Sequence, residues 1–306
     1  MGALFVVTTS AGLAATLLAS LLFGGTSLAY RVLMVVGFVT MSDIWIVVIL
    51  LTGLKAYRQV VAAFVLAYGV VLGGAWLAVD WGLEGLLLAF VVGQALLLFV
   101  LLAAVLGEYA SDTLVGFGFL DGEQVFPDLA VTGLLYNLAV WVDKLAFWFH
   151  PGTGDRVIGP LHASVLYDVP IFLAYLTIVP GMAVFLVRVE TDFAELYDTF
   201  YAMVREGAPL ADIERTRDRL IETVRQGVYE ILKVQGITLA VAFLFAPEVL
   251  AWLGISQHYL GLFYVDAVGV AAQVLFLSIL NIIFYLDQRR LALGLCAAFA
   301  LLNLSL

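Results

Sequence analysis

The sequence predicts an all-α polytopic membrane helical bundle with about nine transmembrane helices. Composition is the first reason, because 64% of the 306 residues are hydrophobic and only 12% are charged. Soluble domains are about 45–50% apolar and about 25% charged. The second reason is a mean hydropathy of +1.08. The third is that apolar residues form long unbroken runs of about 20, the length with which a helix crosses a bilayer.

Nine apolar stretches follow one another, and each is interpreted as one span. They cover residues 3–24, 31–53, 57–79, 84–106, 129–150, 166–187, 227–246, 262–286 and 291–306. The sixth stretch contains Pro170 and Pro180. Proline inside a helix removes a hydrogen bond, so we expect a bend there and freed backbone carbonyl groups.

Basic residues gather on one side of this array, and they orient it. The connections after spans two, six and eight hold Lys55, Arg58, Arg188, Arg205, Arg215, Arg217, Arg219, Arg225, Arg289 and Arg290, and Lys233 lies just inside the seventh span. Only Arg31 and Arg156 fall on the other side. The positive-inside rule makes the basic side cytoplasmic, so the first residue is predicted in the cytoplasm. Residues 108–128 then form an acidic cytoplasmic linker.

The fifth span carries polar groups that are costly at membrane depth. Asn137, Asp143 and Lys144 lie inside it. A charge there costs at least roughly 2.5–3.5 kcal/mol unless it is paired or faces water or protein. Residues adjacent in sequence do not face each other on a helix, so we expect partners on other helices. Lys144 could pair with Asp43 in the second span or with Asp266 in the eighth, and the sequence does not choose.

The eighth span has a polar stripe. Asp266, Gln273, Asn281 and Tyr285 follow one another at steps of seven, eight and four, which keeps them on one face of a helix. One interpretation is interhelical hydrogen bonding, which contributes only about 0.6 kcal/mol per bond on average. The other is a hydrophilic cavity for a polar solute.

Aromatic residues favour the cavity. Five lie on or beside the fifth and sixth spans, namely Tyr136, Trp141, Trp148, Tyr167 and Tyr175. Aromatic faces stack on sugar rings through C–H contacts. Trp and Tyr also mark membrane interfaces, and we interpret Trp148 and Tyr167 as such anchors.

Residues 188–226 form the one substantial soluble segment that we expect. Its first part has apolar residues at spacings of three and four, which predicts an amphipathic helix. Gly207 and Pro209 end that helix, and a second helix with alternating charges follows. We expect a helical hairpin on the cytoplasmic membrane surface. It is either a connector or a docking surface for a partner, made by Phe193, Tyr197, Phe200 and Tyr201.

No sequence motif indicates a cofactor, a metal site or an enzyme. Phosphate-binding loops, dinucleotide fingerprints, zinc motifs and nucleophile elbows are all missing from the sequence. The Gly- and Pro-rich connection of residues 150–168 holds His150, Asp155, His162 and Asp168. We expect it to be a re-entrant or gating loop. A membrane glycosyltransferase or ligase would need Asp155 and Asp168 as a catalytic pair.

Four stretches of the sequence are distinctive, namely GLLYNLAVWVDKLAFWF, VIGPLHASVLYDVPIFLAYLTIVPGMAVFLVRVETDFAELYDTFY, QGVYEILKVQG and LGLFYVDAVGV. Through them the chain resembles the Pel exopolysaccharide transporter family (PelG type), within the multidrug/oligosaccharidyl-lipid/polysaccharide flippase superfamily. The resemblance covers nearly the whole chain.

The resemblance implies a multi-pass transporter of the bacterial cytoplasmic (inner) membrane, with twelve spans in two six-helix lobes. It implies alternating access without ATP hydrolysis on this chain. The substrate would be the growing Pel polymer, a hexosamine-rich polysaccharide of the biofilm matrix. The implied partners are the membrane subunits of the Pel synthase complex, including a cyclic-di-GMP sensor, and a cytoplasmic glycosyltransferase. No nucleic acid is involved.

The nine spans match the third to the eleventh of the twelve that the family implies, so the first two helices and the last are expected to be missing. Three explanations of this shorter length stay open: the chain is a fragment, it is a divergent short member of the family, or its start was wrongly assigned. Residues 1–107 then form a partial first lobe, residues 108–128 the linker, and residues 129–306 the second lobe with the hairpin 188–226. This alignment puts Asp143 and Lys144 at the lobe interface.

Two functions remain besides the enzyme. In the first, the chain exports the polysaccharide, and its path and coupling residues are Asn137, Asp143, Lys144, Asp266, Asp43, Gln273 and Asn281. In the second, it is a scaffold without transport of its own, and the hairpin recruits the glycosyltransferase.

Overall fold

The computed structural model describes residues 2–53, 57–108, 116–117 and 125–305. The chain divides into two compact units, which are described separately. Unit 1 comprises Met1–Val125 with Val157–Leu161, and unit 2 comprises Phe126–Arg156 with His162–Leu306. Lys55 and most of the predicted linker lie outside the described residues.

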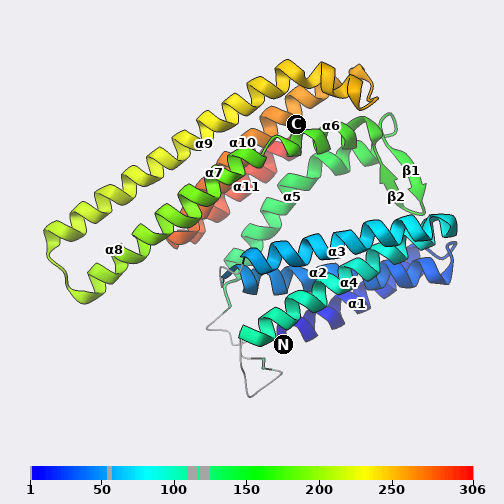
Figure 1. Cartoon of the computed structure of the whole chain (residues 1–306), viewed down its shortest axis with the longest axis horizontal. Helices are drawn as coiled ribbons and strands as arrows, with labels where there is room; N and C mark the ends of the chain where they lie inside the picture. The colour runs from blue at the N-terminus through cyan, green and yellow to red at the C-terminus, as the bar shows by residue number, and fades with distance from the viewer. Residues whose placement is uncertain (1, 54–56, 109–115, 118–124, 306) are drawn as a thin grey trace. The chain divides into compact units, whose positions relative to one another are not determined.

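Unit 1 is built from four helices that pack side by side (Figure 1). These are α1 (Gly2–Leu22), α2 (Leu28–Gly53), α3 (Tyr57–Ala78) and α4 (Gly82–Glu108), with the 3-10 turn η1 (Val79–Trp81) between the last two. The helix α4 packs against both α2 and α3, and its buried Leu97 and Leu101 meet Val47 and Leu51 of α2. Apolar side chains therefore fill the centre of the unit.

Small residues let α3 and α4 approach closely. Gly85, Ala89 and Gly93 recur every fourth position of α4. A Cβ atom built on Gly93 would collide with the side chain of Val71 and would lie 3.0 Å from the carbonyl oxygen of Ala67. Such small-residue faces are typical of helix pairs in membranes, where close backbone packing drives association.

Replacing Gly93 by leucine should therefore destabilise unit 1. Overpacking of a tight contact typically costs about 1–3 kcal/mol. The matched control is Gly69→Leu on α3, because a Cβ at Gly69 meets no atom within 4 Å. Thermal unfolding of the detergent-solubilised protein measures the difference. Equal midpoints for the two variants would show that the contact at Gly93 is not tight.

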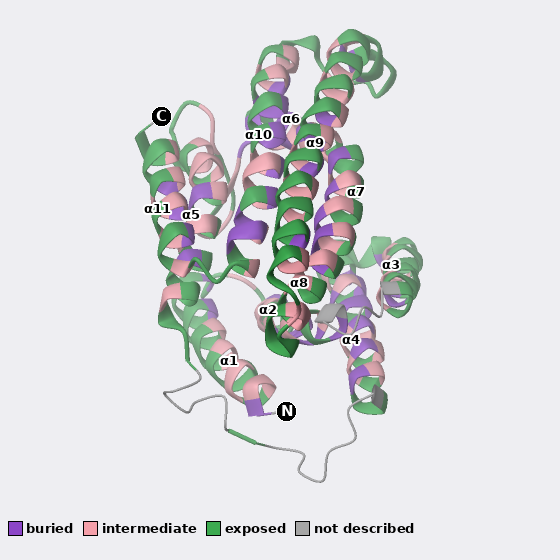
Figure 2. Cartoon of the chain, turned by 90° about the vertical axis from the view of Figure 1, so that its left-hand side faces the viewer, coloured by how far each residue is buried: buried purple, intermediate pink, exposed green. Residues whose placement is uncertain are grey.

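Unit 2 contains the remaining helices and a short hairpin. In chain order they are α5 (Pro127–Phe149), β1 (Asp155–Ile158), β2 (Leu161–Ala163), α6 (Val165–Leu176), α7 (Val179–Val187), the π-helix η3 (Arg188–Phe193), α8 (Ala194–Glu206), α9 (Leu210–Trp252), η4 (Gln257–Tyr259), α10 (Leu260–Tyr285) and α11 (Arg289–Ser305). The helix α5 packs along α11, α6 along α10, and α9 along α7 and α10. Buried residues lie where α6, α7, α9 and α10 face each other (Figure 2).

The predicted fold class is confirmed, and the chain is a multi-pass membrane protein. Every predicted span contains a helix. Within the described ranges, six helical stretches are long and apolar enough to cross a membrane, or seven if the bent pair α6 and α7–α8 is one span. One of the six, Arg58–Gly107, includes both α3 and α4. The number nine stays a prediction.

The predicted bend in the sixth span is confirmed. The segments Val165–Leu176 and Val179–Glu206 meet at 41°, directly before Pro180. The amide of Gln235 on α9 donates a hydrogen bond of 3.1 Å to the carbonyl oxygen of Thr177 at the break. A Cβ on Gly181 would collide with Oε1 of Gln235, so a larger residue there would displace this amide. A broken helix with a satisfied carbonyl is common in transporters.

The predicted helical hairpin forms, and its place relative to the membrane stays a prediction. The helix α9 is one element of 43 residues, about 65 Å long at 1.5 Å per residue. That is about twice the thickness of a hydrocarbon core. All its charges except Glu248 lie between Asp212 and Lys233. The polar half therefore continues the spanning half, and α8 with this half of α9 extends past α10 and α11 (Figure 1).

Candidate functional site

Lys144 lies at the centre of a polar and aromatic cluster in unit 2. Its side chain is 12% exposed, and Nζ donates a hydrogen bond of 2.8 Å to the carbonyl oxygen of Val140. Nζ also lies 3.4 Å from Oδ1 of Asp143. Three aromatic rings surround Nζ, those of Tyr175, Trp141 and Tyr167, at 5.4, 5.8 and 6.0 Å from the ring centroids. The ammonium group is thus stabilised by π faces as well as by the carboxylate.

Asp143 is therefore the ion-pair partner of Lys144, contrary to the expectation of a partner on another helix, whereas Asp143 itself does have such a partner, Tyr167 on α6. Oδ1 of Asp143 also accepts a hydrogen bond of 2.8 Å from the Lys144 backbone N–H. The second carboxylate oxygen accepts a hydrogen bond from the hydroxyl of Tyr167 on α6. Tyr167 is 3% exposed, so it is a buried hydrogen-bond donor and not the interface anchor that the sequence suggested.

A second chain of hydrogen bonds connects α5 and α6 through α10. The hydroxyl of Tyr175 on α6 donates to Oε1 of Gln273 on α10 at 3.2 Å. Nε2 of Gln273 donates to the hydroxyl of Tyr136 on α5 at 3.3 Å. Gln273 thus lies within the site, as predicted from the stripe on the eighth span, and it connects α5 and α6 through two tyrosines.

The spacing of these residues places them along the helix axes. Tyr136 and Lys144 on α5 are eight residues apart, as are Tyr167 and Tyr175 on α6. Eight residues rise about 12 Å, so the cluster runs along the helices for about that distance. Here α5 and α10 are bridged by long side chains, whereas α5 packs directly on α11 and α10 on α6. The arrangement offers hydroxyl, amide, ammonium and carboxylate groups beside aromatic faces.

Asp266 on α10 is the second carboxylate of the site. It is 9% exposed, and the charges of Asp143 and Lys144 act on it. Its Oδ2 is buried, and within the described part of the chain no donor reaches that oxygen. The ion pair of Lys144 in the described part of the chain is with Asp143 and not with Asp266, since Nζ lies 3.4 Å from Oδ1 of Asp143. A buried carboxylate oxygen without a donor is costly, so this oxygen is ready to accept a hydrogen bond.

Three predicted path residues lie elsewhere. Asn137 is exposed and donates at 2.8 Å to the carbonyl oxygen of Gly133 on its own helix. Asn281 donates at 2.7 Å to Oε1 of Glu190 in η3, towards the hairpin end. Asp43 belongs to unit 1, where its Oδ2 accepts a hydrogen bond of 2.7 Å from the hydroxyl of Thr8.

The connection between α5 and α6 is a β-hairpin, and its expected role as a re-entrant or gating loop stays a prediction. Gly159, with φ of +58°, turns β1 into β2. Both carboxylate oxygens of Asp168 are occupied, by Nε1 of Trp148 at 2.8 Å and by the N–H of Ser164 at 3.0 Å. Asp168 therefore fastens the hairpin to the end of α5. Across the described ranges, no group of three or more His, Cys, Asp or Glu side chains could hold a metal ion.

Of the four predicted docking residues, Phe193 is not available. It is 1% exposed and packs against Tyr285 and Tyr197, with ring centroids 5.4 and 6.1 Å away. The apolar spacing that includes Phe193 therefore marks the face of the hairpin that packs inward. Tyr201 is 40% exposed, and Phe200 and Tyr197 are half-buried beside it.

A bidentate ion pair fastens the two arms of the hairpin. Arg188 at the start of η3 contacts the carboxylate of Glu230 on α9 at 2.6 and 3.0 Å, and Asp192 at 2.7 Å. A Cβ on Gly227 would lie 3.3 Å from Cβ of Arg188, so glycine permits the close approach of the arms. The sequence pattern indicated solvated charges here and missed this contact.

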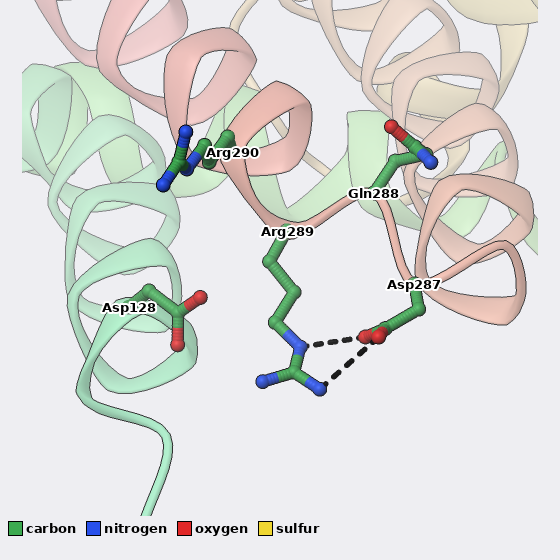
Figure 3. A pocket seen from close by; sticks show the side chains of 5 residues that line it. All are labelled: Asp128, Asp287, Gln288, Arg289 and Arg290. Carbon is green, nitrogen blue, oxygen red and sulfur yellow. Dashed lines mark hydrogen bonds and ion pairs between the residues drawn. The ribbon is translucent and has the colours of Figure 1, made fainter.

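A cavity of about 380 Å³ lies where α5 and α11 begin (Figure 3). Arg289 forms a paired contact with the carboxylate of Asp287 at 2.6 and 3.2 Å, and Asp128 lies across the cavity on α5. The hydrogen bond to Asp287 raises the pKa of Arg289, so this guanidinium stays charged. The cavity contains none of the predicted path residues.

The comparisons with known proteins give one family. The chain matches, over residues 1–306, the family described as "PelG: Putative exopolysaccharide Exporter (EPS-E)". Neither the curated proteins nor the solved structures give a match. The match covers the whole chain, including the Lys144 cluster, the broken helix and the hairpin. The chain therefore belongs to the PelG family of exopolysaccharide exporters.

Proposed function

We propose that this protein moves a hexosamine-rich exopolysaccharide, the Pel polymer, across the bacterial cytoplasmic membrane for the biofilm matrix. The observation that carries the proposal is the Lys144 cluster, which brings a charged pair, an amide and three aromatic rings together inside a helical unit. Intramembrane charges of this kind mark substrate or ion pathways in transporters. Family membership supplies the class of substrate.

In this proposal the residues of the cluster have distinct tasks. Tyr136, Tyr175 and Gln273 present hydroxyl and amide groups to the sugar hydroxyls, and the rings present faces to the sugar C–H groups. Among the described residues, the third N–H of Lys144 and Oδ2 of Asp266 have no partner, so they are free to bind substrate. The charged pair opens in one access state and closes in another, or it lines a continuous conduit.

The proposed orientation puts the first residue and the hairpin in the cytoplasm. The hairpin then meets the cytoplasmic glycosyltransferase that makes the polymer, and other membrane subunits of the Pel complex lie beside the bundle. Exposed apolar residues on this hairpin, such as Leu210 at 70% and Val204 at 47%, support a docking role. They also favour the second candidate, a scaffold that recruits the enzyme without transport of its own.

Proteoliposomes test the transport proposal. The purified full chain should carry a labelled hexosamine oligosaccharide into vesicles faster than vesicles without protein do. Gln273→Leu should lower this flux at least about tenfold, because it severs both tyrosine hydrogen bonds and leaves two half-buried tyrosine hydroxyls without these partners. The control is Asn137→Leu, which lies on α5 outside the network and should transport at the wild-type rate.

Two results would contradict the proposal. Wild-type flux no higher than that of empty vesicles would contradict transport by this chain. Gln273→Leu flux equal to wild type would show that the cluster is structural, and the path would have to run elsewhere.

A further inference from the structure

A second candidate site lies at one end of unit 1. The α1–α2 turn, the α3–α4 turn and the tip of the β-hairpin border an open cavity of about 320 Å³ there. Ser27 and Tyr30 line it from the first turn, Trp81 and Glu84 from the second, and Ile158 from the hairpin. Small-molecule sites are typically about 300–1,000 Å³, so the cavity has room for one sugar ring.

The cavity has an aromatic face whose backbone is held in place. Trp81 is the last residue of η1, and its side chain is 69% exposed. Gly82 follows in a left-handed conformation with φ of +66°, which turns the chain into α4. A Cβ on Gly85 would lie 2.7 Å from Cβ of Trp81 and would collide with the carbonyl oxygen of Ala78. Two glycines thus fix the position of Trp81 while its indole stays open.

A carboxylate lies beside this aromatic face. The hydroxyl of Ser27 donates to Oε1 of Glu84 and in turn accepts a hydrogen bond of 3.0 Å from the Tyr30 N–H. This relay sets the direction of the Glu84 side chain. Oε2 of Glu84 makes no hydrogen bond to any residue within the described ranges, so it can accept one from a ligand.

The combination identifies the class of ligand. A pyranose ring presents C–H groups on one face and hydroxyl or amine groups at its edge, which match an indole face and a carboxylate. None of the residues that line the cavity is cationic, so it offers no ion pair to a lipid phosphate or an acidic sugar. Glu84 favours a neutral or amino-substituted ring.

We propose that this cavity is a sugar-binding subsite for a neutral or amino-substituted pyranose ring of the exported polymer. The inference rests on the proposed function for its substrate. In the orientation proposed above, all three connections are extracytoplasmic, so the subsite holds the polymer where it leaves the membrane. Trp81 is the stacking platform and Glu84 the acceptor.

Binding to the full chain in lipid nanodiscs tests the subsite, with tetramers of glucosamine and of N-acetylglucosamine as probes. Trp81→Ala should lower the affinity for both by about tenfold, whereas Trp81→Phe keeps a stacking face and should retain most of it. Glu84→Gln should lower the affinity for the glucosamine tetramer by up to about fivefold and leave the affinity for the N-acetylglucosamine tetramer nearly unchanged. Isothermal titration calorimetry measures all four proteins.

The matched control is Trp76→Ala. Trp76 is 80% exposed and lies five residues earlier on α3, but it does not line the cavity. Tryptophans that only anchor the protein at a membrane interface would respond alike, so equal affinities of the Trp76 and Trp81 variants would overturn the subsite. A wild-type protein that binds neither tetramer would overturn it too. Because these assays measure binding without transport, the outcome is separate from the vesicle test of export.

Discussion

Replacing Lys144 by methionine should abolish export of the polysaccharide. The ammonium group is the only cation in the cluster, and it holds the carboxylate of Asp143 together with Tyr167. Methionine fills much of the same volume but offers no donor, so substrate hydroxyls lose a partner and Asp143 loses its counter-charge. Polysaccharide released by cells that depend on this chain measures the effect, and membrane abundance is measured in parallel.

The double variant Asp143→Asn with Lys144→Met separates transport from folding. Removing one member of a fully buried pair costs about 3–5 kcal/mol, whereas replacing both is often nearly neutral. Since Asp143 is 36% exposed, the single substitutions should cost less than that range. We expect the double variant to reach the membrane at wild-type abundance and still to export nothing.

The matched control is Lys233→Met. Lys233 also lies over an aromatic ring, that of Tyr229 at 5.9 Å, but it is exposed on the hairpin half of α9. Export by this variant should equal wild type. Wild-type export by the double variant would refute the proposed role of the charged pair.

Placing two aspartates on the hairpin should abolish capture of the cytoplasmic glycosyltransferase. Tyr201 and Val204 are three residues apart on α8 and are 40% and 47% exposed. Truncating central apolar anchors typically removes at least about 2 kcal/mol of binding free energy, and buried charges remove more. The variant Tyr201→Asp with Val204→Asp should therefore lose the purified partner in a pull-down assay. Thr199→Asp, on the opposite face of α8, should keep it.

The same variant distinguishes the two candidate functions. If flux in proteoliposomes stays at the wild-type rate while capture is lost, the hairpin docks the enzyme and the bundle transports. If the wild-type protein captures the partner but shows no flux in vesicles, the scaffold is the better description. Capture that survives the two aspartates would place the docking surface elsewhere.

The sequence was sufficient to predict the helices, because the apolar runs that must cross a membrane are long and separated by turn residues. It also predicted the bend before Pro180 and the place of Gln273 in the site, since both follow from local rules of backbone and helix periodicity. The helices, the bend and the face on which Gln273 lies depend only on residues that are close together in the sequence.

Other contacts depend on where a side chain reaches, which periodicity does not encode. Adjacent residues point about 100° apart on a helix, yet the long Lys144 side chain turns back to Val140 and reaches Asp143. Tyr167 has the residue type of an interface anchor but is buried by α10. The continuity of α9 was missed because an amphipathic pattern gives the face of a helix and does not show that the helix runs unbroken from the hairpin into the next span.

The unbroken length of α9 has a mechanical consequence. The exposed residue Leu210 lies at one end of the helix, and Gln235 follows 25 positions later. The amide of Gln235 donates a hydrogen bond to the Thr177 carbonyl at the break between α6 and α7. A continuous helix is stiff, so a partner that turns the free end of α9 also acts on the hydrogen bond between Gln235 and Thr177. The length of α9 thus couples its free end to the joint between α6 and α7, which lies two residues after Tyr175 of the cluster.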